Sequence, residues 1–369
     1  MIHIERASSR VFKNLVIGAG PAGVAIASTL LDGGSTPTLW VDPHFQSGRL
    51  AHYTEVPSNT KVGLFLKYAT TPASISGSSD QITQVFKGMD SDKGCSLGAA
   101  QQMVTKITET IRREYSDEVV MQRGRVDSLA LTNGVWHING DQARADRVFL
   151  ALGSHPKEAS PQHCAEAMAL DDALMPSKLS GLVSPDETVG VIGSSHSAVL
   201  VLMNLLEMQN GPKVVNLYRS PLKYAKFLPD GRIVLDNTGL KGQAAEWARE
   251  HLETGHFESQ GRLKRVDVTK EDAESALAKC SKIVSATGFD RNPLPEISVD
   301  GERLGDVSHD PSSGAIISGK LYGYGIAFPE EITDPEYGHK ESNVGLWKFM
   351  RYVRDVLPAQ NLCTLQRAG

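Results

Sequence analysis

The stretch that most constrains the fold begins at Asn14. A short apolar run, Leu15–Ile17, ends in the pattern Gly18-x-Gly20-x-x-Gly23, and apolar residues then recur at helical spacing as far as Leu31. This order predicts a buried strand, a tight turn and a helix. The first glycine of such a unit permits the turn, the second lets backbone approach a pyrophosphate, and the third lets the helix pack against the strand. The helix N-terminus then offers unpaired N–H groups to an anion, so the stretch predicts a dinucleotide site.

Two further residues support this interpretation. Pro21 stands where a first helical residue needs no backbone N–H. A second apolar run, Thr38–Val41, ends in Asp42. An acidic residue about 20 positions after such a turn typically accepts a hydrogen bond from a ribose hydroxyl.

The segment "VIGAGPAG" resembles the FAD site of flavoproteins with two dinucleotide-binding domains, including the flavin-containing and amine N-hydroxylating monooxygenases. The resemblance implies an α/β fold with two Rossmann-like domains, one for FAD and one for NAD(P), and an antiparallel β-meander in the FAD domain. It also implies that Asp42 contacts the adenosine ribose. The residues that it places at the FAD pyrophosphate are Gly18, Gly20, Pro21, Ala22 and Gly23.

The composition of the chain limits the kinds of molecule that the protein can bind. The chain has 369 residues, enough for two or three domains, and its net charge of −5 argues against nucleic acid and favours a small-molecule substrate. No apolar run is long enough to span a membrane, and no signal peptide is visible. The cysteines are widely spaced without a Cys-x-x-Cys pair, which predicts a reducing, cytoplasmic setting with neither a redox dithiol nor a metal site. The four cysteines are Cys95, Cys164, Cys280 and Cys363. The sequence does not predict an oligomeric state.

Residues 46–61 are rich in turn formers and predict a loop. In the resembling monooxygenases this loop passes beside the flavin. Gly48–Leu50 partly matches a Gly-Gly-x-Trp segment, which implies that Arg49 lies at the cofactor. Ser58–Thr60 resembles an Asn-containing segment, which implies that Asn59 faces the flavin, the alternative being an Asx turn. "FLK" resembles a substrate-contacting segment of the amine N-hydroxylases and implies this role for Lys67, the alternative being a solvated lysine.

The residues from 72 to 152 predict a loop, then a helix, then a group of β-strands. Residues 72–94 predict an exposed loop, and the apolar spacing of Leu97–Glu114 predicts an amphipathic helix. Val119–Leu152 contains short β-rich runs separated by two Asn-Gly pairs, which are strong hairpin signals and predict a three-stranded meander and a returning strand. By resemblance, Val126 lies near the adenine and Gly153 touches FAD.

Residues 156–182 predict a crossover linker, after which a second strand and glycine turn begin at Thr188. The strand Val214–Tyr218 follows, and Arg219 stands where a guanidinium meets a 2′-phosphate, so the resemblance implies NADPH. Ser195 replaces the middle glycine, which leaves open a domain kept only as scaffold. The residues predicted at the nucleotide are Gly193, Ser194, Ser195, His196, Arg219 and Ser220.

The segment Lys282–Phe289 contains "ATGF", which resembles the return of the chain from the NADP domain and implies cofactor contacts from Thr287 and Gly288. By the same resemblance, Val344 and Gly345 begin a C-terminal helix whose N-terminus faces the flavin pyrimidine. These landmarks predict a discontinuous FAD-binding domain, residues 1–155 and 291–369, around an NAD(P)-binding domain, residues 156–290.

Together these resemblances imply an FAD-dependent, NADPH-using monooxygenase that transfers oxygen from a flavin hydroperoxide to a small organic substrate. Two alternatives stay open. The first is an FAD-dependent dehydrogenase, reductase or oxidase that inserts no oxygen. The second is a regulatory protein that binds dinucleotides without turnover. Ser195 favours this alternative, as does the absence, between Gly153 and Gly193, of the Phe-x-Gly-x-x-x-His fingerprint that precedes the second glycine turn in many of the resembling monooxygenases.

Overall fold

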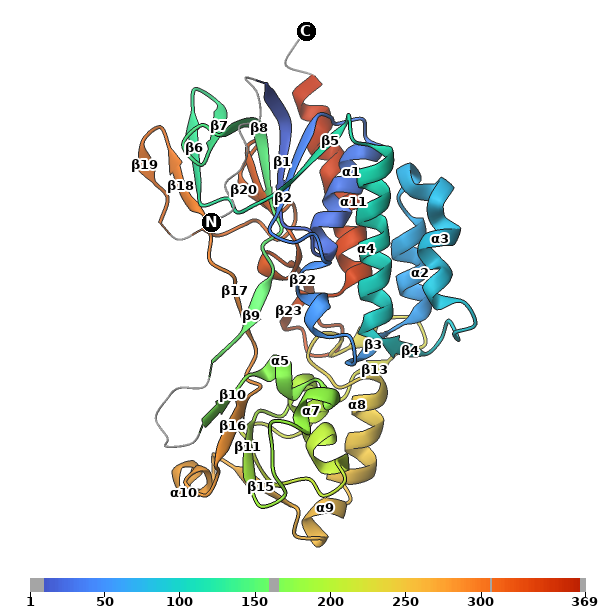
Figure 1. The fold of residues 1–369 in the computed structure, drawn as a ribbon, viewed down its shortest axis with the longest axis vertical. Coiled ribbons are helices and arrows are strands. Elements are labelled where there is room, and N and C mark those ends of the chain that lie inside the picture. The colour runs from blue at the N-terminus through green and yellow to red at the C-terminus, as the bar shows by residue number, and fades with distance from the viewer. Residues whose placement is uncertain (1–9, 159–165, 306, 366–369) are drawn as a thin grey trace.

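The computed structural model describes residues 10–158, 166–305 and 307–365, which form two lobes (Figure 1). The large lobe is built on a ten-stranded sheet with the order β19-β18-β6-β7-β8-β1-β2-β5, in which β21 also pairs with β8 and β20 with β21. Its strands are β1 (Val11–Ile17), β2 (Thr38–Asp42), β5 (Val119–Arg123), β6 (Ser128–Thr132), β7 (Val135–Ile138), β8 (Ala143–Leu150), β18 (Glu296–Val299), β19 (Glu302–Arg303), β20 (Ala315–Ile317) and β21 (Leu321–Gly323).

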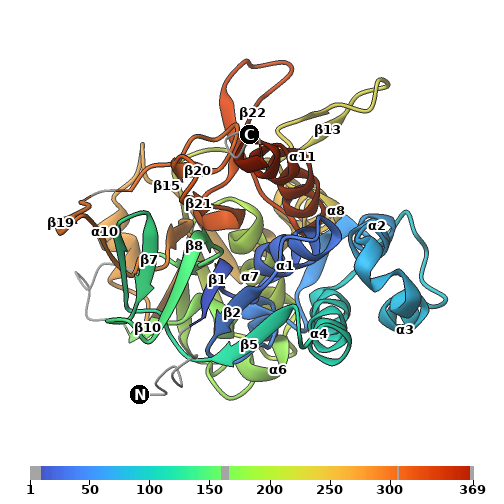
Figure 2. The same ribbon diagram turned by 90° about the horizontal axis from the view of Figure 1, so that it is seen from above.

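The helices of the large lobe gather on one side of this sheet (Figures 1 and 2). They are α1 (Pro21–Asp32), α2 (Val62–Thr70), α3 (Ser79–Thr83), α4 (Leu97–Glu114) and α11 (Leu346–Leu365), with the 3₁₀ turns η1 (Gly48–His52), η2 (Ala73–Ser78), η3 (Gln84–Phe86) and η5 (Gly325–Ala327). Two small hairpins complete the lobe, β3 (Pro57–Lys61) with β4 (Gly94–Ser96) and β22 (Glu330–Thr333) with β23 (Lys340–Asn343).

The small lobe carries a five-stranded, all-parallel sheet of order β10-β16-β11-β12-β15. Its strands are β10 (Glu166–Met168), β11 (Thr188–Ile192), β12 (Lys213–Tyr218), β15 (Leu263–Asp267) and β16 (Lys282–Ser285), with a hairpin of β13 (Lys226–Phe227) and β14 (Ile233–Val234). Its helices are α5 (Leu170–Ala173), α6 (Pro176–Leu179), α7 (His196–Glu207), α8 (Gly242–Trp247), the π-helical turn η4 (Ala248–Leu252), α9 (His256–Ser259) and α10 (Ala273–Leu277). Two antiparallel strands, β9 (Ser154–Pro156) and β17 (Phe289–Arg291), join the lobes.

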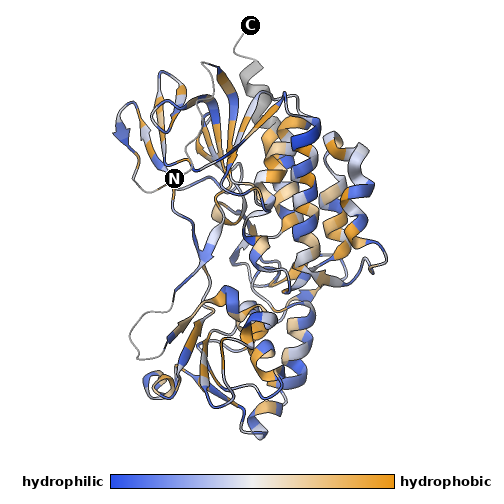
Figure 3. Cartoon of the chain, in the orientation of Figure 1, coloured by the Kyte–Doolittle hydropathy of each residue, from blue (hydrophilic) through white to orange (hydrophobic). Residues whose placement is uncertain are grey.

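Apolar side chains are buried on both faces of the large sheet. Val16, Trp40 and Phe149 pack under the helices, whereas Leu15 and Leu39 pack against the opposite side. Strands buried on both faces read as continuous apolar runs, as these do. Each such side chain contributes roughly 1.5–3 kcal/mol through burial. Figure 3 shows apolar residues along the strands and helices of both lobes, interspersed with hydrophilic ones.

The architecture confirms the predicted fold class of two Rossmann-like units and a β-meander. β6, β7 and β8 are successively antiparallel, and β8 then pairs parallel with β1. The predicted returning strand is therefore the third strand of the meander itself. Both Asn-Gly pairs adopt positive φ at both residues. Asn133–Gly134, with 50° and 77°, forms a two-residue hairpin turn, whereas Asn139–Gly140 lies in the four-residue connection between Ile138 and Ala143.

Three loop predictions were wrong. Residues 72–94 contain η2, α3, η3 and β4, and they bury Ile75, Ile82 and Phe86. The spacing of these three residues, seven and four positions, is compatible with one helical face, but the many Ser, Gly and Asp residues between them favoured a loop. Within 46–61, η1 and β3 replace the predicted loop. The predicted linker 156–182 contains β10, α5 and α6, although residues 159–165 lie outside the described part of the chain.

No helix in the described ranges is both long and apolar enough to span a membrane.

Candidate functional site

The turn between β1 and α1 needs glycine at two positions for packing within the protein. Gly18 has φ +103°, and a Cβ there would overlap the carbonyl oxygen of Ala151 and lie 3.0 Å from its carbonyl carbon. A Cβ on Gly23 would lie 2.8 Å from the carbonyl carbon of Gly18. These glycines therefore let α1 and the end of β8 approach the turn closely.

Gly20 is different because nothing in the protein crowds it. Its φ of −74° and ψ of −176° are open to any residue, and a Cβ there would meet Gly48 Cα at 3.8 Å. Gly20 is the N-cap of α1, yet no side chain caps this helix and its first turn carries no acidic residue. The helix end thus keeps its partial positive charge and its unpaired N–H groups. This arrangement fits the pyrophosphate of a dinucleotide.

Two side chains from β2 hold the turn in shape. Asp42 accepts hydrogen bonds from the N–H of Ala19 at 2.8 Å and from those of His44 and Phe45 at 2.8 and 2.7 Å. Trp40 donates from Nε1 to the carbonyl oxygen of Gly18 at 2.9 Å. Asp42 is 8% exposed, and its carboxylate already accepts three hydrogen bonds that shape the turn. A ribose hydroxyl would therefore be a further donor to this carboxylate.

Other predicted residues lie around the same end of the sheet. Gly153 has φ +72° and follows β8. Val126 is buried just after Gly124, whose N–H donates to the carbonyl oxygen of Asp42 at 3.2 Å. Gly325, which the sequence did not predict, lies against the N-terminal turn of α1, where a Cβ would be 2.6 Å from the Ala22 Cβ. Their contacts with a cofactor stay a prediction.

Arg49 joins the two lobes. Its Nη2 pairs with Asp171 of α5, its Nε donates to the hydroxyl of Tyr53 at 2.8 Å, and its Nη1 lies 3.4 Å from the carbonyl oxygen of Ser154. Tyr53 in turn donates to Asp171 at 2.8 Å, and burial raises the pKa of this phenol. We call Arg49, Tyr53 and Asp171 the interlobe clasp. The sequence contained no periodic or motif signal for it.

Replacing Asp171 with Asn should loosen the lobes. Two partly buried donors would lose their charged acceptor, which costs about 1–3 kcal/mol. We expect a lower urea midpoint and faster proteolytic cleavage near β9. Asp172→Asn is the matched control, because Asp172 pairs at 2.6 Å with exposed Lys178 in the same lobe. Equal behaviour of the two variants would contradict an interlobe role for Asp171.

The small lobe repeats the geometry of the first turn. Gly193 has φ +134°, and a Cβ there would lie 2.5 Å from the carbonyl oxygen of Ala286, as Gly18 is crowded by Ala151. Asn216 Nδ2 donates to the carbonyl oxygen of Gly193 at 2.8 Å, as Trp40 does to Gly18. The N–H groups of both glycines donate to the second strand at 2.8 Å. Asn216, a polar residue in an apolar strand, was the signal that sequence reasoning missed.

Ser195 takes the place of the middle glycine without strain. It is the N-cap of α7, with φ −94° and ψ −171°, and neither its side chain nor an acidic first-turn residue caps the helix. Ser195 is exposed, and Ser194 is half-buried beside it. The helix end is therefore available to an anion, although the serine Cβ occupies space that Gly20 leaves open.

His196 follows at the start of α7. Burial, together with the nearby Lys241 ammonium, lowers the pKa of His196 to about 4, so the imidazole is neutral at pH 7. Its Nδ1 is shielded from solvent and has no hydrogen-bond partner among the described residues. Arg219 is exposed at the end of β12, Ser220 is half-buried, and Thr287 and Gly288 follow β16.

The two residues predicted to be catalytic lie apart from the turns. Asn59 is exposed on β3, where its Cα approaches Gly242 at the start of α8, 3.7 Å from a Cβ placed there. Asn59 thus lies where the lobes meet. Lys67 is exposed on α2, whose Phe65 and Tyr68 are buried. Nothing in this geometry brings Lys67 to the other predicted residues.

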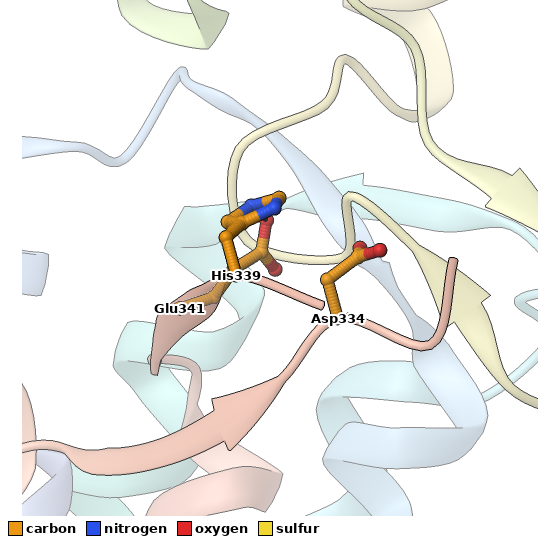
Figure 4. A group of neighbouring side chains, drawn as sticks. All are labelled: Asp334, His339 and Glu341. Atoms are coloured by element: carbon orange, nitrogen blue, oxygen red, sulfur yellow. Dashed lines mark hydrogen bonds and ion pairs between the residues drawn. The ribbon is translucent and has the colours of Figure 1, made fainter. Parts of the chain in front are cut away.

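A second interlobe contact lies between the β22–β23 hairpin and residues 235–241. Asp334, His339 and Glu341 converge there (Figure 4). Asp334 accepts from the Leu235 N–H at 2.7 Å, and Glu341 accepts from the Asn237 N–H at 3.0 Å. Burial disfavours ionised Glu341, but hydrogen bonds from Thr238 and Asn237 hold its pKa below the ordinary value. Because these oxygens already bind donors, the three residues act as a loop anchor rather than as metal ligands.

Val344 and Gly345 immediately precede α11 and lie beside this anchor. The N–H of Val344 donates to Asn237 Oδ1 at 3.3 Å, so residues of the small lobe reach the helix end predicted to face the flavin. Sequence reasoning assigned no role to residues 235–241.

Known proteins share this arrangement. A model of the pyridine nucleotide-disulphide oxidoreductase family matches residues 12–232. Monooxygenase AgnR1 of Paecilomyces divaricatus is 38% identical over 385 residues, which cover 93% of this chain and 96% of that protein.

Solved structures at low identity share the fold. The ornithine N-hydroxylase of Kutzneria sp. 744 matches with a TM-score of 0.60 at 13% identity, covering 96% of this chain and 100% of that one. The L-lysine 6-monooxygenase of Pseudomonas syringae matches with a TM-score of 0.61 at 13% identity, covering 97% and 99%. With two matching turns, a family model spanning more than half of the sequence and a full-length relative, the chain belongs to the pyridine nucleotide-disulphide oxidoreductase family.

Proposed function

We propose that this protein is an FAD-dependent, NADPH-using monooxygenase that acts on a small organic substrate. The observation that carries the proposal is the repeated geometry of the two turns, each with an uncapped helix end and a side chain that ties down the first glycine. A relative that is 38% identical and is named a monooxygenase supports oxygen insertion. The absence of a Cys-x-x-Cys pair argues against the dithiol chemistry for which the family is named.

In this proposal, residues 1–155 and 291–369 bind FAD, and residues 156–290 bind NADPH. The turn at Gly20 and the end of α1 hold the FAD pyrophosphate, while Asp42 both shapes that turn and receives the ribose. Val344 and Gly345 lie at the pyrimidine edge. In the second lobe the end of α7 meets the nucleotide phosphates, and Arg219 meets the 2′-phosphate.

Bound FAD would supply the bond chemistry, accepting hydride from NADPH and activating dioxygen. The protein positions the two dinucleotides and excludes water. The interlobe clasp and the loop anchor hold the lobes in one orientation, which positioning requires because misplacement by about 1 Å can cost about a hundredfold in rate. In the protein without nucleotide the His196 imidazole is neutral at pH 7, and it can donate one hydrogen bond to a phosphate.

Anaerobic mixing with NADPH provides the first test. The purified protein should be yellow and should bleach when NADPH is added. Labelled dioxygen then separates oxygen insertion from simple electron transfer. With a small sulfide as the probe, one labelled atom should enter the sulfoxide and the other should leave as water.

The alternatives predict different results. A protein that releases only hydrogen peroxide at a rate equal to NADPH consumption, whatever probe is offered, is an oxidase or reductase. A protein that binds flavin and is never bleached by NADPH is reduced by another donor or serves regulation, and the proposal is then wrong.

A further inference from the structure

Lys348 stands where its charge is unfavourable. It lies in the first turn of α11, where the partial positive charge of the helix end repels a cation, and it is only 21% exposed. Burial lowers the pKa of Lys348, and the nearby Lys241 and Arg351 act in the same direction, against the ion pair with Asp236. A residue that breaks local rules at such cost is characteristic of functional positions.

The ammonium is held by the other lobe. Its Nζ donates to Asp236 Oδ2 at 2.6 Å and to Asn237 Oδ1 at 2.7 Å. Asp236 also forms an ion pair with Lys241, whose Nζ lies 2.7 Å from Asp236 Oδ1. The Asp236 carboxylate thus faces two ammonium groups beside a helix N-terminus, while the Glu341 carboxylate accepts a hydrogen bond from the Asn237 N–H at 3.0 Å.

The stem of Lys348 packs on the residue predicted to meet the flavin. A Cβ on Gly345 would lie 3.6 Å from Lys348 Cδ and 3.9 Å from Cγ. The N–H of Val344 and the ammonium of Lys348 share Asn237 Oδ1 as their acceptor. Asn237 Oδ1 therefore bridges the ammonium and the backbone that precedes α11.

We propose that the Lys348 ammonium stabilises negative charge on the pyrimidine side of reduced FAD, and that Asp236 of the nucleotide lobe opposes this effect with its own charge. This inference rests on the proposed function and adds a residue that changes the ratio of reduced to oxidised flavin. It also makes the flavin equilibrium depend on contact between the lobes, because Asp236 and Lys348 come from different ones.

The test is a redox titration of the purified holoenzyme against a reference dye. At the potential where the wild-type flavin is half reduced, K348M should hold about tenfold less reduced than oxidised flavin, the size expected for one charge about 12 Å away at an effective dielectric of about 20. K348R should restore the wild-type ratio. D236N removes the opposing charge and should shift the ratio in the reverse direction.

K340M is the matched control, since Lys340 is an exposed lysine of the neighbouring hairpin that pairs with Glu331 at 2.8 Å. Its flavin ratio should equal that of the wild type. The inference is overturned if K348M titrates like the wild type, or if K348M and D236N shift in the same direction. Should K348M lose its flavin, the sign of the D236N shift decides. A wild-type protein without FAD would instead overturn the proposed function itself.

Discussion

Gly20→Val should give a folded protein that purifies without FAD. The backbone at Gly20 is open to any residue, and the nearest atoms to an added Cβ are 3.8 and 3.9 Å away, so the protein itself tolerates the side chain. The same side chain would stand between the pyrophosphate and the N–H groups at the start of α1. We expect FAD affinity to fall at least about a hundredfold, or about 2.7 kcal/mol. Absorbance of the purified protein and calorimetric FAD titration measure it.

Two glycine variants make this result specific. In Gly23→Ala the added Cβ would lie 2.8 Å from the carbonyl carbon of Gly18, so we expect loss of thermal stability together with loss of flavin. In Gly77→Ala the Cβ meets nothing within 4 Å, and both properties should be unchanged. A Gly20→Val protein that retains stoichiometric FAD would contradict the assignment of the FAD site.

Arg219→Ala should remove most of a preference for NADPH over NADH. Arg219 is exposed at the end of β12, where a guanidinium can bind a 2′-phosphate through two parallel hydrogen bonds. Such charge-assisted bonds contribute about 1.5–3 kcal/mol, which corresponds to a preference of roughly ten- to a hundredfold. The variant should bind NADPH more weakly and NADH almost unchanged, as stopped-flow reduction of the flavin will show.

Arg232→Ala is the control for this experiment, because Arg232 is an exposed arginine of the same lobe that pairs with Asp230 at 2.7 Å. It should keep the wild-type preference. If Arg219→Ala and the wild type reduce equally fast with both nucleotides, the phosphate contact does not exist. If neither nucleotide reduces the flavin, Ser195 has closed the site and the electron donor is a different molecule.

Patterns within short stretches of the sequence predicted many of the turns, hairpins and helices. The glycine turns, the two Asn-Gly hairpins and the helix at Leu97–Glu114 all follow from chemistry within a few residues, and the structure has each of them. The error at residues 72–94 has the same origin. Its short helical turns bury a few apolar residues among many Ser, Gly and Asp residues, so their structure depends on packing against α2 and α4 rather than on local composition.

The sequence by itself thus determined the turn at Gly18–Gly23, because three glycines at fixed spacing between an apolar strand and an apolar helix are compatible with few other folds. It indicated the second turn through the strand, the first glycine Gly193 and the apolar helix that follows. Only the tertiary structure decided how Arg49 meets Asp171 and how Lys348 meets Asp236. These partners lie more than a hundred residues apart, on different lobes. A long-range ion pair leaves no periodicity in the chain, because its geometry exists only after both lobes have folded and met.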